Sequence, residues 1–237
     1  GRGAATANFL RLLIFFFLMR EGLPALGEVE GSNFISLRWY PIEAMFGILP
    51  LITGSLIVTL GAALIAVPFG IGTAVYISEI APRWMREILK PLVELLGGLP
   101  SVVLGFLGIL VVSPNLRIFL DLPTGLTAFT GSLLLGGIAV PTVVSVAEDA
   151  LDSVPRAYRE GAWALGATKW QTIWRVTLPA AKSGVLTAIM LGVGRAIGET
   201  MTVMMVTGNA PVLATSLGSL FSPVRTMTAT IAAEMGE

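Results

Sequence analysis

The chain has 237 residues, of which 54% are hydrophobic and only 13% are charged, whereas an ordinary soluble domain carries roughly 25% charged residues. Its fifteen basic and fifteen acidic side chains give a formal net charge of zero. The chain therefore has no overall positive potential that would attract nucleic acid. The lack of cysteine and histidine excludes thiol catalysis, disulfides, the usual zinc sites and a Ser-His-Asp triad. This composition indicates a membrane protein that is not itself an enzyme, and we expect no cofactor.

Apolar stretches long enough to cross a bilayer recur along the chain, since one helical crossing needs roughly 20 residues. The first, at about 4–20, carries Arg11 and is only marginally long; we expect a partial span that begins upstream, with a signal peptide as the alternative. Further spans are expected at about 48–78, 92–114, 124–147 and 180–207. Pro68 predicts a kinked or tilted second span. The sequence thus predicts an all-α polytopic bundle forming a single transmembrane domain over 1–237.

The distribution of basic residues indicates the orientation in the membrane. Lysine and arginine concentrate in the connections that follow the second span and precede the last one. We therefore expect the N-terminus and residues 153–179 in the cytoplasm and Glu237 outside. Glu79, Arg83 and Arg86 are expected to form a solvated cluster at the interface.

The connection at 153–179 has the local signals of two short helices. Ser153 is a plausible first helix start, with a proline fitting the first turn. Gly166 predicts a left-handed stop. Thr168 restarts the chain, and Gln171 three residues later completes a capping box.

The same connection has the residue spacing of a known docking loop. It resembles the EAA loop of ATP-binding-cassette (ABC) import permeases, in which Glu-Ala-Ala is followed at fixed spacings by Gly and by Leu-Pro. The matching residues are Glu160, Gly161, Ala162, Gly166, Leu178 and Pro179. The resemblance implies docking into a cleft of a separate ATPase subunit; an amphipathic helix pair lying on the membrane is the alternative. The chain has no Gly-x-x-x-x-Gly-Lys-[Ser/Thr] loop, so another polypeptide would have to bind ATP.

The last expected span contains two opposite charges. Arg195 and Glu199 are four residues apart, and we expect them on one face of a helix. An arginine in the bilayer costs roughly 2.5–3.5 kcal/mol, so it should face protein or a water-filled path. Its planar donors also match a tetrahedral oxyanion. From chemistry alone, a substrate pathway and a structural ion pair remain equally open. Glu94 is interpreted as a helix-end carboxylate, with a role in the pathway as the alternative.

The residues around this pair resemble the phosphate-specific ABC importer permeases, in particular the C-type subunits of the Pst system. The matching run extends from Gly194 to Met201 and continues at Gly208 and Asn209. Further matching stretches lie at 46–50, 66–72, 76–79, 94–103 and 164–170. The resemblance implies the fold of a type I ABC importer permease with six spans, so we expect this chain to be truncated at both ends. It also implies that phosphate passes Arg195 and Glu199.

The resemblance further implies the partners and the location. We expect a related permease subunit in a heterodimer, two ATPase subunits and an extracytoplasmic phosphate-binding protein, all at the cell membrane of a prokaryote. Two alternatives remain. One is a permease of the same superfamily for sulfate, molybdate or phosphonate. The other is a proton-coupled carrier or channel that uses Arg195 and Glu199 as a relay.

Overall fold

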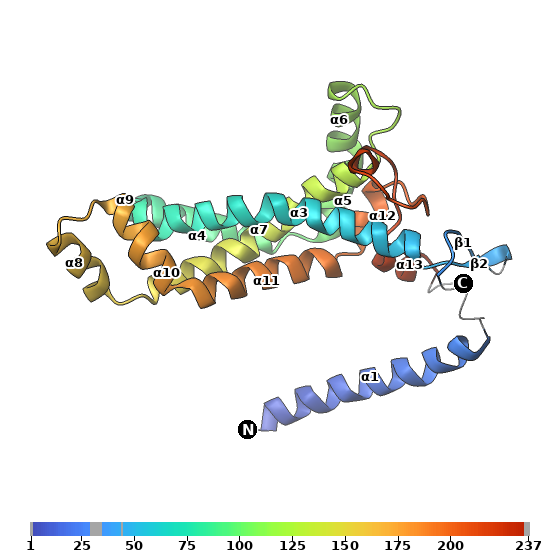
Figure 1. Cartoon of the computed structure of the whole chain (residues 1–237), viewed down its shortest axis with the longest axis horizontal. Coiled ribbons are helices and arrows are strands. Elements are labelled where there is room, and N and C mark those ends of the chain that lie inside the picture. The colour runs from blue at the N-terminus through green and yellow to red at the C-terminus, as the bar shows by residue number, and fades with distance from the viewer. Residues whose placement is uncertain (1, 29–34, 44, 235–237) are drawn as a thin grey trace. The chain divides into compact units, whose positions relative to one another are not determined.

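The computed structural model describes residues 2–28, 35–43 and 45–234 (Figure 1). The chain divides into two compact units, Gly1–Pro50 and Leu51–Glu237. Helices make up most of the described residues, and the only paired strands among them form one short hairpin. The expected all-α class is therefore confirmed.

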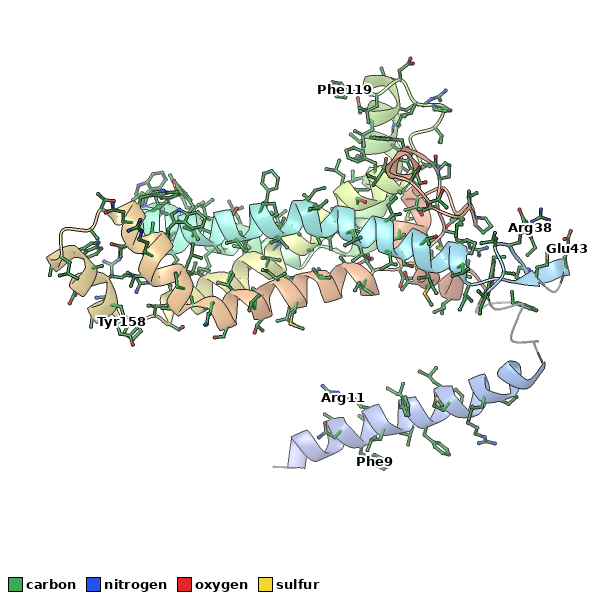
Figure 2. The ribbon with its side chains drawn as sticks, viewed as in Figure 1. Phe9, Arg11, Arg38, Glu43, Phe119 and Tyr158 are labelled. Carbon is green, nitrogen blue, oxygen red and sulfur yellow. The ribbon has the colours of Figure 1, made fainter. Side chains whose placement is uncertain are left out.

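The first unit contains one long helix and the hairpin. Helix α1 (Arg2–Glu28) continues past Pro24, so the polar residues after the apolar stretch do not end it. Strand β1 (Trp39–Tyr40) pairs antiparallel with β2 (Met45–Phe46) across the 3₁₀ turn η1 (Pro41–Glu43). The apolar side chains of α1 are exposed, and Figure 2 shows Phe9 and Arg11 projecting outward from the helix.

The remaining elements follow in chain order. The helices are α3 (Leu49–Val75), α4 (Arg83–Gly97), α5 (Ser101–Leu107), α6 (Ser113–Phe119), α7 (Ala128–Asp152), α8 (Arg156–Ala164), α9 (Lys169–Thr172), α10 (Leu178–Ala180), α11 (Lys182–Gly198), α12 (Met201–Val206) and α13 (Met227–Glu234). Three π-helical turns, η2 (Tyr76–Ile80), η3 (Gly108–Val112) and η4 (Ile173–Thr177), adjoin them, and η5 (Leu217–Phe221) is a 3₁₀ turn.

Within the described residues, three helical stretches are long and apolar enough to cross a membrane: Leu49–Ile80, Ser101–Phe119 and Ala128–Asp152. A fourth results if Lys169–Ala180 and Lys182–Gly198, which meet at a bend of 75°, are counted as one span. Helix α1 is not among them, so the partial span at 4–20 stays a prediction.

One helix boundary differs from the span expected at 92–114. The chain leaves α4 after Gly97 and restarts at Ser101, because Pro100 has no N–H to donate and disfavours a helical conformation in the residue before it. The apolar stretch that follows extends to Phe119. The stretch expected at 92–114 is therefore divided between α4 and the helix that starts at Ser101, and its crossing of the membrane stays a prediction.

Helix α7 lies at the centre of the second unit. Its Val143 is fully buried between Gly70 of α3 and Gly192 of α11. A Cβ atom added to Gly70 would lie 2.6 Å from the Val143 Cβ, and one added to Gly192 would also collide with Val143. These glycines allow both neighbouring helices to approach α7 at backbone distance. Figure 1 shows α7 and α11 running from the end with α8–α10 to the end with α12.

Candidate functional site

Residues 153–179, called the docking segment after the role expected from the sequence, follow their local sequence signals closely. Gly166 has a φ of +82°, as expected for a left-handed stop, and the Thr168–Gln171 capping box is present. One expectation is wrong: Ser153 does not start a helix. Its hydroxyl donates to the Ala150 carbonyl at 2.7 Å and so belongs to the end of α7, while α8 begins at Arg156.

Much of the surface of α8 is exposed. Glu160 and Gly161 are exposed and Ala162 is half-buried, and a Cβ atom added at Gly161 would have no neighbour within 4 Å. Aromatic side chains accompany this surface: Tyr158 projects outward from α8 (Figure 2), and Trp163 is half exposed. A second backbone could therefore approach α8 closely beside Glu160.

The two ends of the expected Gly-to-Leu-Pro spacing lie in different environments. Gly166 stands in open space, with nothing within 4 Å of an added Cβ. Leu178 is half-buried against the hydrophobic cluster around α7, and Pro179 is exposed in the first turn of α10. The segment thus packs against the core at Leu178 and is exposed at Gly166.

The inner side of α8 is fixed by Arg159. Its guanidinium donates to Glu79 Oε1 at 2.6 and 3.0 Å, to the Leu151 carbonyl at 2.9 Å and to the Val154 carbonyl at 2.7 Å. The side chains of Arg159 and Glu79 are 13% and 8% exposed. The expectation that Glu79 belongs to a solvated cluster is therefore wrong, because α8 covers it.

Helix α4 is tied to the end of α7 by a second group of charges. Lys90 Nζ lies 2.8 Å from Glu148 Oε2, and the Glu148 side chain is only 3% exposed. The hydrogen bond to Glu148 and the surrounding carboxylates raise the pKa of Lys90 above its usual value. Arg86 reaches Asp152 at 3.8 Å and also donates to the Ser78 carbonyl. Arg86 is therefore held in a network and is not merely solvated.

Arg195 of α11 reaches two other helices. Its guanidinium donates to Thr142 Oγ1 of α7 at 2.9 Å and to the Gly97 carbonyl of α4 at 3.0 Å. Both acceptors are neutral, so these bonds orient the guanidinium without cancelling its charge. Two of its five donor positions are used, and the others can reach a ligand.

A cavity of about 290 Å³ lies beside this guanidinium. It is lined by residues of three helices: Val93, Glu94, Gly97, Pro141, Thr142, Ser145, Val146 and Arg195. Thr142 and Ser145 add hydroxyl groups to the wall, and Glu94 adds a carboxylate. Sequence reasoning missed both hydroxyl groups. It interpreted Glu94 as a helix-end residue, which agrees with its place in the last turn of α4, and kept a pathway role only as the alternative. The position of Glu94 at the start of the uncharged run before Pro100 was the available signal.

Glu199 does not share a helical face with Arg195, contrary to expectation. Helix α11 ends at Gly198, and Glu199 is extended, with a φ of −73° and a ψ of 130°. Its carboxylate accepts from Thr202 at 3.4 Å and its carbonyl from Thr228 at 3.0 Å. Among the described residues of the second unit, no ion pair joins Arg195 to Glu199 and Glu199 does not line the Arg195 cavity.

These features define a class: a helical protein with membrane-spanning candidates, an exposed helical segment at 153–179 and an arginine-lined cavity between its helices. The chain belongs to the family described as the binding-protein-dependent transport system inner membrane component, which matches residues 66–235. The ABC permease family expected from the sequence is thereby confirmed.

Individual relatives agree with this family. The chain is 44% identical to a probable ABC transporter permease protein YqgH of Bacillus subtilis, over 100% of this chain and 79% of the relative. It is 37% identical to the phosphate transport system permease protein PstC of Mesorhizobium japonicum, over 90% and 70% of the two chains. It is 35% identical to PstC 1 of Mycobacterium tuberculosis, over 94% and 70%.

Proposed function

We propose that this chain is the transmembrane permease subunit of an ATP-driven importer of inorganic phosphate and forms half of the translocation path. The observation that carries the proposal is the charge of Arg195, held by two neutral acceptors beside a cavity. A fixed guanidinium with free donors suits a tetrahedral oxyanion. The similarity to PstC proteins supports phosphate as that oxyanion.

The energy for transport comes from a separate chain in this proposal. Glu160, Gly161, Ala162 and Gly166 form the docking surface for an ATPase subunit. Leu178 anchors that surface in the bundle, and Pro179 follows it at the start of α10. The complex contains a related permease, two ATPase subunits and an extracytoplasmic phosphate-binding protein. It lies in the cell membrane of a prokaryote, with the N-terminus and docking segment cytoplasmic.

Arg195 and Glu199 have different roles along the path. Arg195 contacts the anion in the cavity, whereas Glu199 holds the chain between α11 and α12 through its bonds with Thr202 and Thr228. Carriage of sulfate, molybdate or phosphonate is the first alternative function. A proton relay through Arg195 and Glu199 is the second, and their separate environments count against it.

Phosphate uptake by the reconstituted full complex tests the proposal. We expect uptake to require ATP, to persist when the proton gradient is collapsed and to withstand excess sulfate. Arg195→Ala should abolish uptake while the complex still assembles, and Thr142→Val should only weaken it, because Gly97 still orients the guanidinium. Uptake that stops with the proton gradient while ATP remains would refute an ATP-driven importer.

A further inference from the structure

The Arg195 cavity contains a carboxylate that the proposed function does not use. Glu94 lies in the last turn of α4, three residues before Gly97, whose carbonyl accepts from Arg195. Glu94 and Gly97 both line the Arg195 cavity, and the Glu94 side chain is exposed at its mouth. No hydrogen-bond or ion-pair partner of the Glu94 carboxylate is found among residues 2–28, 35–43 and 45–234.

The cavity therefore combines two kinds of polar group. Arg195 can only donate hydrogen bonds, and the hydroxyl groups of Thr142 and Ser145 can donate or accept. An ionised carboxylate such as Glu94 can only accept. A ligand that satisfies the whole wall must thus carry acceptor atoms for Arg195 and at least one hydrogen-bond donor for Glu94; for an oxyanion, that donor is an O–H.

Inorganic phosphate meets both requirements at neutral pH, because its mono- and dianions keep at least one proton. Sulfate is fully deprotonated there, and it would bring an oxygen lone pair against the Glu94 carboxylate. A lipid phosphodiester also lacks the proton. We propose that Glu94 is a specificity-determining residue that accepts a hydrogen bond from the P–OH of phosphate while Arg195 binds its anionic oxygens. This inference rests on the proposed function and names the group that selects the substrate within it.

The size of the effect follows from the lost bond. A hydrogen bond to a charged group, once removed or replaced by repulsion, changes affinity on the order of 10- to 100-fold. In Glu94→Gln the amide keeps the side-chain shape and can donate as well as accept. The variant should therefore bind sulfate better and lose most of the preference for phosphate.

The chain contains no cysteine, which allows a direct test of the cavity. Val146→Cys places a single thiol in the wall and leaves both hydroxyl groups intact. In the full complex without binding protein, the labelling rate by a small neutral maleimide is measured against added inorganic phosphate or sulfate. With Glu94 present, we expect half-protection at a concentration at least about tenfold lower for phosphate than for sulfate.

Glu94→Gln should bring the two half-protection concentrations within about threefold. Glu87→Gln is the matched control, since Glu87 is an exposed carboxylate on the same helix and does not line the cavity. It should keep the preference. An unchanged ratio in Glu94→Gln, or equal protection by both anions with Glu94 present, would overturn the inference.

Phosphate uptake by the same complexes separates this inference from the proposed function. If ATP-dependent uptake is intact but the ratio of the half-protection concentrations of sulfate and phosphate does not depend on Glu94, only the selectivity inference fails. If the ratio changes as expected but no uptake occurs, the cavity selects phosphate and the importer proposal fails.

Discussion

Removal of the Arg159 side chain should destabilise the protein more than removal of an exposed side chain of α8. Arg159→Ala deletes the pair with Glu79 and the bonds to the Leu151 and Val154 carbonyls. The Glu79 side chain is only 8% exposed, so its charge is left buried without a partner. Breaking a buried pair from one side costs about 3–5 kcal/mol, and we take the lower limit because Arg159 itself is 13% exposed. About 3 kcal/mol corresponds to a fall of about 6–12 °C in Tm for a chain of this size.

Thermal unfolding of the purified complex in detergent measures this loss. Arg156→Ala is the matched control, because Arg156 is an exposed arginine on the same helix, and such changes alter stability by less than about 0.5 kcal/mol. Arg159→Ala combined with Glu79→Gln should recover part of the loss, since the buried charge is then gone. Equal Tm values for the Arg159 and Arg156 variants would refute the view that this buried pair fixes α8.

Three further changes have defined outcomes. Glu160→Lys should release the ATPase during purification without lowering Tm, because Glu160 is exposed; unchanged co-purification would argue against docking there. Lys90→Met should lower Tm by leaving Glu148 buried and unpaired. The folded state raises the Lys90 pKa. The stabilising contribution of Lys90 is therefore complete below the ordinary lysine pKa of about 10.4, and it disappears as the pH rises through the raised pKa. A pH titration of Tm should show this loss in the parent and not in Lys90→Met. Gly166→Ala should cost about 1 kcal/mol from its positive φ alone, since the added methyl group meets open space; an unchanged Tm would contradict that strain.

The most accurate predictions from the sequence concern local structures that depend only on residues close together in the chain. The left-handed Gly166 and the Thr168–Gln171 capping box follow from rules that span three or four residues, and both are present. The Arg195–Glu199 expectation used an equally short spacing, but it assumed that the helix continues. Because α11 ends at Gly198, the same spacing places the two charges in different surroundings.

Contacts between distant segments could not be predicted in this way. Arg159 and Glu79 are 80 residues apart, and Arg195 and Gly97 are 98 apart. Such pairs depend on which helices pack together, and glycines such as Gly192 decide that through their fit against single side chains. The sequence therefore predicted that Glu79 is solvated at the membrane interface, although α8 covers its side chain in the fold.

Two helices join the docking segment and α7 to the cavity. Helix α4, one wall of the cavity, is fastened to α7 by the Lys90–Glu148 pair at 2.8 Å. Helix α11, the opposite wall, continues directly from the docking segment across the 75° bend. Helix α11 also packs against α7, where Gly192 meets Val143. The hydrogen bond from Arg195 to the Gly97 carbonyl connects α11 to α4 beside the cavity. The position of the guanidinium therefore depends on how all three helices pack, which is why no single stretch of sequence could predict it.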